Sequence, residues 1–218
     1  MSAARTAYNR RVRLLMKRAL DVVVVAVSIA VLAPVIAVVA VLVAITTGRP
    51  VLFKQVRLGR NGRSFTLLKF RTMSEARDSG GNLLPDGDRI TRTGRVLRQW
   101  SLDELPTLVN VLRGEMSLVG PRPLLPEYWA LYSSEQRRRH ELPPGIAGPV
   151  PAYGRNSLSW ADKFALDVWY VDNWSLRLDA KIFSRTLWKA ITREGVSADG
   201  HATMPRFEGE SPNRKVLE

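Results

Sequence analysis

A long uninterrupted run of apolar residues near the N-terminus dominates the hydrophobic pattern of the chain. The run extends from Val22 to Ile45 without a charged side chain, and only Ser28 and Pro34 are not aliphatic. A helix of this length would measure about 36 Å, which is enough to cross a hydrocarbon core of about 30 Å. Because a cleaved signal peptide has a shorter apolar stretch, the pattern predicts a membrane helix that is retained.

Proline inside this run and positive charge at both of its ends predict how the helix sits in the membrane. Pro34 removes a backbone N–H and its ring clashes with the preceding turn, so we expect it to divide the run into two shorter pieces. Positive residues mark the cytoplasmic side of a membrane segment. They are Arg5, Arg10, Arg11, Arg13, Lys17 and Arg18 before the run, and Arg49, Lys54, Arg57, Arg60, Arg63, Lys69 and Arg71 after it. The sequence therefore predicts a re-entrant helix that enters from the cytoplasm, breaks at Pro34 and returns to the same face. A proline-kinked helix that spans the membrane once is the alternative.

Charges of both signs lead into the apolar run. Asp21 lies at the edge of the expected hydrocarbon region, and Lys17 and Arg18 precede it on the same face of the predicted helix. This pattern indicates either an ion pair on the helix surface or the binding of lipid head groups, and both interpretations are retained.

The periodicity changes after Gly48, where short β-rich segments replace the long helix. The segments PVLFKQVRL and SFTLLKFRT are joined by a turn that contains Asn61-Gly62, which is typical of a β-hairpin. Lys69 and Arg71 share one face of the second strand because side chains repeat every two residues. They form either a phosphate clamp or a solvated, charged strand edge.

Two adjacent carboxylates, Asp103 and Glu104, stand at the start of a predicted helix. Ser101 and Glu104 fit a capping box, but Pro106 would then lie inside the helix. The alternative is a helix that begins near Leu105 with both acids on the entering turn. In either arrangement the positive helix end keeps the carboxylates ionised, which suits a nucleophile or a metal ligand.

Composition and charge limit the classes of catalytic and binding site that the chain can contain. The chain has 218 residues, a net charge of +13, no cysteine and two histidines, so thiolate zinc sites and cysteine nucleophiles are excluded and an anionic partner is expected. P-loop, dinucleotide-binding, zincin and hydrolase-elbow motifs are absent from the sequence. Pro121 and Pro123 restrict the backbone around Arg122, a device suited to bidentate phosphate binding. Carboxylates together with arginines indicate Mg²⁺-assisted chemistry at phosphorus.

An ordered set of motifs resembles the bacterial sugar transferase family, the monotopic phosphoglycosyl transferases. The set consists of K-R-x-x-D (17–21), a proline-broken membrane helix, P-V-L-F-K-Q-V-R-L-G (50–59), K-F-R-T-M (69–73), D-E-L-P (103–106), G-E-M-S-L-V-G-P-R-P (114–123) and G-R-N (154–156). The resemblance covers about residues 14 to 193. It implies transfer of a sugar 1-phosphate from a UDP-sugar to polyprenyl phosphate with release of UMP, the first membrane step of polysaccharide or glycoconjugate synthesis.

The resemblance also assigns roles to individual residues. It implies that Asp103 attacks the β-phosphorus to form a covalent phosphosugar intermediate, and that Glu104 binds Mg²⁺. The implied substrate-binding residues are Lys69, Arg71, Arg98, Pro121, Arg122, Pro123, Arg155 and Asp167, and those at the lipid head groups are Lys17, Arg18, Asp21 and Pro34.

Together these observations predict an α+β, mostly helical protein of the bacterial inner membrane. Residues 1–47 form a basic lead-in and the re-entrant helix, 48–196 a small interfacial catalytic domain with a β-hairpin on the cytoplasmic face, and 197–218 a disordered tail. The expected partners are a UDP-sugar, polyprenyl phosphate and membrane lipids, without nucleic acid, and a homodimer is an open alternative. A competing hypothesis is a membrane-anchored basic scaffold that binds anionic lipid or nucleic acid without catalysis.

Overall fold

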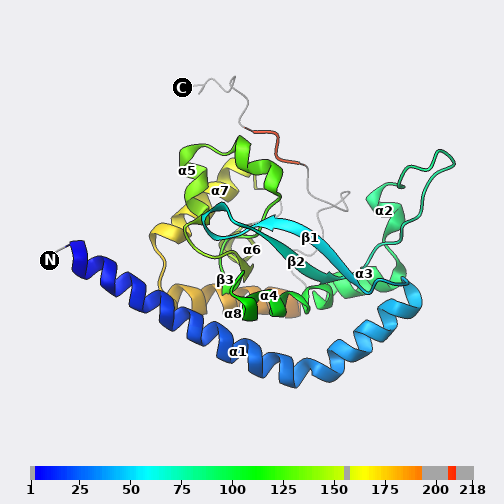
Figure 1. Ribbon diagram of the computed structural model, residues 1–218, viewed down its shortest axis with the longest axis horizontal. Coiled ribbons are helices and arrows are strands. Elements are labelled where there is room, and N and C mark those ends of the chain that lie inside the picture. Colours follow the sequence, from blue (N-terminus) through cyan, green and yellow to red (C-terminus); the bar gives the residue numbers. More distant parts are fainter. Residues whose placement is uncertain (1–2, 155–157, 193–205, 210–218) are drawn as a thin grey trace.

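Helices make up most of the ordered structure. The computed structural model describes residues 3–154, 158–192 and 206–209 (Figure 1). The helices are α1 (Ala3–Thr46), α2 (Asp86–Arg89), α3 (Arg92–Gln99), α4 (Thr107–Arg113), α5 (Ser134–Arg137), α6 (Pro149–Tyr153), α7 (Trp160–Asp172) and α8 (Leu176–Thr192). The 3₁₀ turns are η1 (Arg60–Gly62), η2 (Leu102–Glu104), η3 (Pro126–Leu131) and η4 (Arg138–His140), and the strands are β1 (Leu52–Leu58), β2 (Ser64–Phe70), β3 (Ser117–Val119) and β4 (Gly145–Ala147). This is the mostly helical architecture with small sheets that the sequence predicts.

Helix α1 is continuous through Pro34, so the predicted interruption of the helix at this residue is wrong. The missing N–H of a proline breaks one hydrogen bond, and a long helix can absorb that loss by bending. Figure 1 shows α1 bent near its middle, with the rest of the chain on the inner side of the bend. The helix is long and apolar enough to cross a membrane by length and composition.

Both halves of α1 pack against the rest of the chain. Val25 in the first half is fully buried in a cluster with side chains of β2 and α4. Val39 and Val43 in the second half pack against Phe70 of β2 and Leu97 of α3. The opposite face leaves large apolar side chains exposed, among them Val23, Val27, Val31, Val38, Val41 and Ile45. An exposed apolar face of this length is typical of a surface that contacts lipid.

The predicted β-hairpin is confirmed. Strands β1 and β2 are antiparallel, and Phe53 pairs with Lys69 while Arg57 pairs with Phe65. Asn61 in the connecting turn has a positive φ of 55°, a conformation that asparagine tolerates better than most residues. A second sheet consists of the parallel pair β3 and β4.

One part of the segment that was predicted to be disordered packs against the domain. Phe207 is 5% exposed and lies in an aromatic cluster with Tyr128, Tyr132 and Phe164. Its backbone N–H donates to the Tyr128 hydroxyl at 3.2 Å. The prediction of disorder for 197–205 and 210–218 lies outside the described residues.

Candidate active site

Glu104 lies at the centre of a cluster of positive charge. Its Oε1 is 2.6 Å from Lys69 Nζ and 3.6 Å from an Nη atom of Arg122. Burial alone would raise the pKa of Glu104, but Lys69 and Arg122 outweigh it and hold that pKa below its ordinary value. These three side chains line one pocket with Arg57 and Pro123, so the predicted Lys69, Glu104, Arg122 and Pro123 do meet.

Asp103 is in a different electrostatic environment from its neighbour. The residue is 8% exposed, and burial, followed by repulsion from Glu104, raises the pKa of Asp103 to about 6. Lys69 and Arg98 act in the opposite direction. The result is a poorly solvated carboxylate close to cations, an arrangement typical of a reactive group.

The two acids sit on a 3₁₀ turn rather than inside a capped helix. Ser101 has a positive φ of 54° and its side chain makes no capping bond, so the capping-box interpretation is wrong. Helix α4 begins only after Pro106, which agrees with the alternative in which both acids precede the helix. The left-handed Ser101 turns the chain sharply between α3 and η2 and thereby delivers Asp103 and Glu104 side by side.

Side-chain hydrogen bonds fix α4 to the hairpin that carries Lys69. The Asn110 side chain accepts from the Leu68 N–H at 3.0 Å and donates to the Thr66 carbonyl at 2.7 Å, and Thr107 Oγ1 donates to the Leu68 carbonyl at 2.9 Å. Since Asn110 is fully buried and Thr107 nearly so, these bonds are protected from water. They set the distance between β2 and η2, and therefore between Lys69 and Glu104.

Backbone contacts fix the position of the loop that carries Arg122. A Cβ on Gly120 would lie 2.2 Å from the Pro143 carbonyl oxygen, so only glycine permits this approach between the Pro121–Pro123 loop and residues 143–145. An Nη atom of Arg139 donates to the Arg122 carbonyl at 2.8 Å. The Arg122 side chain itself is 60% exposed and lines the pocket beside Glu104.

Asp167, predicted to bind substrate, forms a buried ion pair with Arg139. Its Oδ2 accepts from Arg139 Nη2 at 2.7 Å and Nε at 2.9 Å, and both residues are 2% exposed. Arg139 in turn donates to the Arg122 carbonyl, so these contacts connect Asp167 with the loop that carries Arg122. A role for Asp167 in substrate binding stays a prediction.

Two further predicted cations, Arg98 and Arg71, are not among the residues that line this pocket. Arg98 of α3 donates to Thr72 Oγ1 at 3.0 Å and influences Asp103 electrostatically. Arg71 donates to the backbone carbonyls of Met73 and Arg49, at 3.2 and 3.0 Å, and lies 3.5 Å from Glu75, so a phosphate clamp of Lys69 and Arg71 stays a prediction. Pro121 belongs to the restricted loop, and Arg155 lies outside the described residues.

Arg57 was not predicted as a site residue, although it lines the pocket beside Lys69 and Arg122. Its Nε is buried and has no hydrogen-bond partner among the described residues. Burial, and then the charge of Arg122, lower the pKa of Arg57. The hairpin register could have identified Arg57. Phe53 pairs with Lys69 and therefore shares its sheet face, and Arg57 lies on the same face as Phe53 because side chains alternate along a strand.

The carboxylates at this site, Asp103 and Glu104, could bind Mg²⁺ only if phosphate oxygens of a substrate supplied further ligands. No group of three or more histidine, cysteine, aspartate or glutamate side chains that could hold a metal occurs in the described part of the chain. Mg²⁺ is commonly bound by one or two carboxylates, waters and substrate phosphates, and Glu104 with the adjacent Asp103 supplies such carboxylates.

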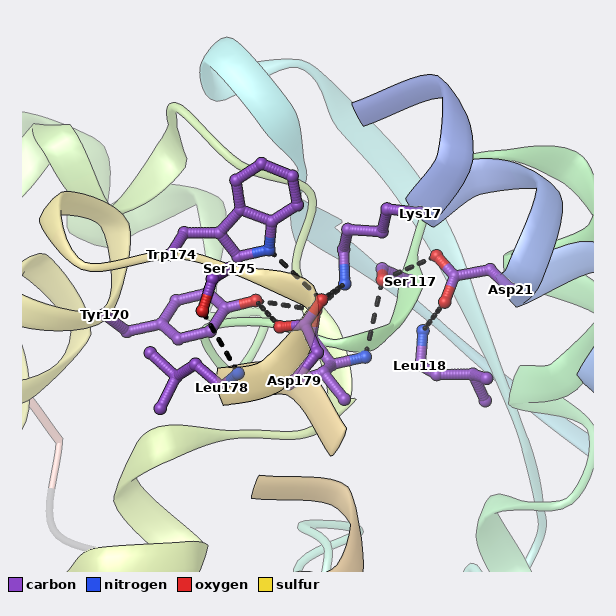
Figure 2. Close-up of polar contacts among 10 residues, drawn as sticks. Lys17, Asp21, Ser117, Leu118, Tyr170, Trp174, Ser175, Leu178 and Asp179 are labelled. Carbon is purple, nitrogen blue, oxygen red and sulfur yellow. Dashed lines mark hydrogen bonds and ion pairs between the residues drawn. The ribbon is translucent and has the colours of Figure 1, made fainter. Parts of the chain in front are cut away.

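The predicted head-group residues make contacts inside the protein. Figure 2 shows Lys17 of α1 reaching Asp179 of α8, at 2.6 Å, and Asp21 accepting from Ser117 Oγ at 2.7 Å. The predicted ion pair within α1 is therefore wrong, because each charge has a partner on another element. Arg18 donates to the carbonyls of Val111 and Leu112 at the end of α4. Lipid contact by these residues stays a prediction, as does a role for Pro34.

Comparison with known proteins identifies the relatives of this chain. The family described as "Bacterial sugar transferase" matches residues 12–193. "Uncharacterized sugar transferase EpsL" of Bacillus subtilis (strain 168) is 50% identical over 196 residues, which cover 90% of this chain and 97% of that protein. "UDP-glucose:undecaprenyl-phosphate glucose-1-phosphate transferase" of Caulobacter vibrioides is 39% identical, over 83% of this chain and 71% of that protein. "UDP-N-acetylgalactosamine-undecaprenyl-phosphate N-acetylgalactosaminephosphotransferase" of Aeromonas hydrophila is 35% identical, over 83% of this chain and 44% of that protein.

Proposed function

This chain belongs to the bacterial sugar transferase family, and from that premise we propose that it moves a sugar 1-phosphate from a UDP-sugar to polyprenyl phosphate and releases UMP. The relatives named for UDP-sugars and undecaprenyl phosphate support this substrate pair. The observation that carries the proposal is the buried Asp103 next in sequence to Glu104, which lines a pocket together with the positive side chains of Lys69, Arg57 and Arg122. A scaffold without catalysis would leave this arrangement without a role.

The proposed reaction has two displacements at one phosphorus. The Asp103 carboxylate attacks the β-phosphorus of the UDP-sugar, and the bond from that phosphorus to the oxygen bridging to the α-phosphorus breaks, so that UMP leaves. An oxygen of polyprenyl phosphate then attacks the phosphorus of the aspartyl phosphosugar, and the Asp103 carboxylate is regenerated. The covalent intermediate allows a soluble donor and a lipid acceptor to use the site in turn.

The cations around Glu104 suit the charge that develops in these steps. Lys69, Arg57 and Arg122 neutralise the phosphate oxygens of the donor, which otherwise repel the attacking carboxylate. Glu104, whose pKa is held low, is the carboxylate that would hold Mg²⁺ together with the donor phosphates. When bound, Mg²⁺ would withdraw charge from the phosphate oxygens.

The packing of α1 supports a monotopic arrangement at the cytoplasmic face of the bacterial membrane. Lys17 before the apolar run contacts Asp179, and Val43 near its end packs with Phe70 and Leu97. Both ends of the run thus contact one domain, which lies on one side of any membrane. In this proposal the exposed valines of α1 enter the near leaflet and the helix returns to the face from which it came.

The test of the reaction compares Asp103→Asn with Asp88→Asn, which removes an exposed carboxylate of α2. We expect Asp103→Asn to lower UMP release at least about a thousandfold, because the nucleophile is lost, and Asp88→Asn to leave it unchanged. The assay supplies a UDP-sugar, polyprenyl phosphate and Mg²⁺, and repetition with a chelator tests the metal. Intact-mass measurement without acceptor should show one added sugar phosphate on the wild-type chain. Substantial turnover by Asp103→Asn would rule out this mechanism.

A further inference from the structure

A second cavity lies away from the catalytic carboxylates. Its volume is about 750 Å³, and it lies between residues 10–21 of α1, the hairpin turn η1 and the segment that follows α4. Asp103, Glu104 and Lys69 are not among its lining residues. The volume falls in the range that binding cavities for small molecules and cofactors occupy.

The wall of this cavity carries more positive than negative charge. Arginine and lysine side chains from two elements line it, namely Arg10, Arg11, Lys17, Arg18 and Arg60, against the carboxylates Asp21 and Glu141. Figure 2 shows that Lys17 and Asp21 already have partners on other elements, Asp179 and Ser117. The positive charge left for a ligand therefore belongs to the arginines.

The arginines are weakly neutralised within the protein. Arg11 makes no ion pair with any side chain that the structure describes. Arg10 is 3.4 Å from Glu141 and both side chains are about half exposed, so this ion pair contributes little. Among the described residues, Arg60 donates to the Glu141 backbone carbonyl, and Arg18 donates to the backbone carbonyls of Val111 and Leu112. An anion would find guanidinium groups here that have no strong carboxylate partner.

The same cavity has an apolar edge that continues into the membrane helix. Leu14 and Leu15 line it, and Leu15 is 64% exposed. Met16 and Leu20 are also exposed, and they connect this edge with the exposed valines of the apolar run. A ligand that contacts both the arginines and the leucines needs an anionic head group and a long apolar tail. A soluble anion would leave the leucines exposed to water.

We propose that this cavity binds an anionic glycerophospholipid. The arginines bind its phosphate, and its acyl chains lie along Leu15 and the exposed face of α1. Met116 is the one described residue that lines both this cavity and the pocket of Glu104, Lys69 and Arg122, so we assign the bound lipid a role separate from that of the acceptor. The site would fix the N-terminal half of α1 at the depth of the head groups, and it does not depend on the proposed reaction.

Lipid binding to the full-length chain tests the proposal. Native mass spectrometry of the protein in detergent measures the affinity for dioleoylphosphatidylglycerol and for its zwitterionic analogue dioleoylphosphatidylcholine. The test variant is Arg11→Gln/Arg60→Gln, and the charge-matched control is Arg13→Gln/Arg63→Gln, which alters the same helix and the same turn outside the cavity. We expect the wild type and the control to prefer phosphatidylglycerol, and the test variant to bind it about twentyfold more weakly.

Each alternative has its own result. Equal binding of both phospholipids, or equal losses in the two double variants, would overturn the proposal. Displacement of phosphatidylglycerol by millimolar inorganic phosphate would assign the cavity to a soluble anion. Displacement by undecaprenyl phosphate, together with a raised KM for that acceptor in Arg11→Gln/Arg60→Gln, would assign it to the substrate. Matching thermal unfolding of the variants and the wild type in lipid-free detergent confirms that weaker binding does not reflect misfolding.

Discussion

Two neighbouring carboxylates, Asp103 and Glu104, differ in charge behaviour because only one of them has a cation in direct contact. Lys69 is 2.6 Å from Glu104, whereas Asp103 is buried with cations at longer range. The pKa of Asp103 therefore rises to about 6 while that of Glu104 falls. Because the pKa of Asp103 is higher in the folded state, loss of its proton lowers the stability of the fold as the pH rises from the ordinary pKa of an aspartate to about 6. Such destabilised carboxylates are common at reactive sites.

The raised pKa of Asp103 predicts an acid limb in the pH profile of the enzyme. Attack on phosphorus requires the carboxylate, so kcat/KM for the UDP-sugar should fall as the pH drops below about 6, by about tenfold per pH unit. Arg98 lowers this pKa, so Arg98→Gln should move the limb to higher pH, whereas Arg95→Gln on the exposed face of α3 should not. UMP release measured between pH 5 and pH 8 gives the profile. A limb that stays in place in Arg98→Gln would contradict the assignment of this ionisation to Asp103.

The buried pair of Asp167 and Arg139 predicts a large loss of stability when one partner is removed. Asp167→Asn leaves the Arg139 charge buried without a carboxylate, at a cost of about 3–5 kcal/mol in the free energy of unfolding. Asp172→Asn, which removes the exposed carboxylate partner of Arg138, should leave stability nearly unchanged. Thermal unfolding in detergent, followed by tryptophan fluorescence, separates the two. A raised KM for the donor in Asp167→Asn without lower stability would instead favour direct contact with substrate.

Among the elements, those built from local signals are the ones that the sequence predicts correctly. Asn61-Gly62 and the alternation around it specify the hairpin, and Pro106 specifies the start of α4. The predicted break at Pro34 is wrong because the rest of α1 is strongly helical and packs on both sides of the bend, which compensates for one lost hydrogen bond. The presence of a proline in the sequence does not reveal whether packing elsewhere compensates for the lost hydrogen bond.

The site residues that lie in short local motifs could be predicted, whereas contacts between distant parts of the chain could not. The carboxylate pair and the restricted Arg122 are visible as short motifs. In contrast, the contacts of Asp167 with Arg139 and of Lys17 with Asp179 join residues far apart in sequence, so no spacing rule finds them. Arg57 is an intermediate case, since the hairpin register places it on the sheet face of Lys69.

The packing of α3 against the strand end depends on a missing side chain at Gly94. A Cβ there would lie 2.0 Å from the Thr72 carbonyl oxygen, which is backbone and cannot rotate away. Gly94→Ala should therefore destabilise the fold by roughly 1–3 kcal/mol and displace Arg98 from Thr72, which lowers activity as well. Gly87→Ala is the control, because a Cβ on Gly87 meets no atom within 4 Å. Equal melting temperatures for the two variants would show that α3 adjusts to the methyl group without strain.

At the scale of the whole molecule, α1 has one face that packs against the rest of the chain and another that exposes apolar side chains. Polar contacts such as Lys17 with Asp179, and apolar ones such as Val43 with Phe70, hold its inner face along most of its length. The outer face is a continuous surface of exposed valines. In the proposed monotopic arrangement α1 inserts into one leaflet and returns, because crossing the bilayer would separate one end of the helix from the residues that it contacts.

This geometry predicts that both flanks of the apolar run react from one side of the membrane. The natural chain has no cysteine, so Tyr8→Cys, which is 68% exposed before the run, and Ser79→Cys, which is exposed after it, can be labelled singly. A membrane-impermeant maleimide should modify both in inside-out vesicles and neither in intact spheroplasts. Val31→Cys, 68% exposed at the bend region, should resist the reagent in both preparations if lipid covers it. Modification of Tyr8→Cys and Ser79→Cys from opposite sides would require α1 to cross the bilayer, which is incompatible with simultaneous contact of Lys17 and Val43 with one domain.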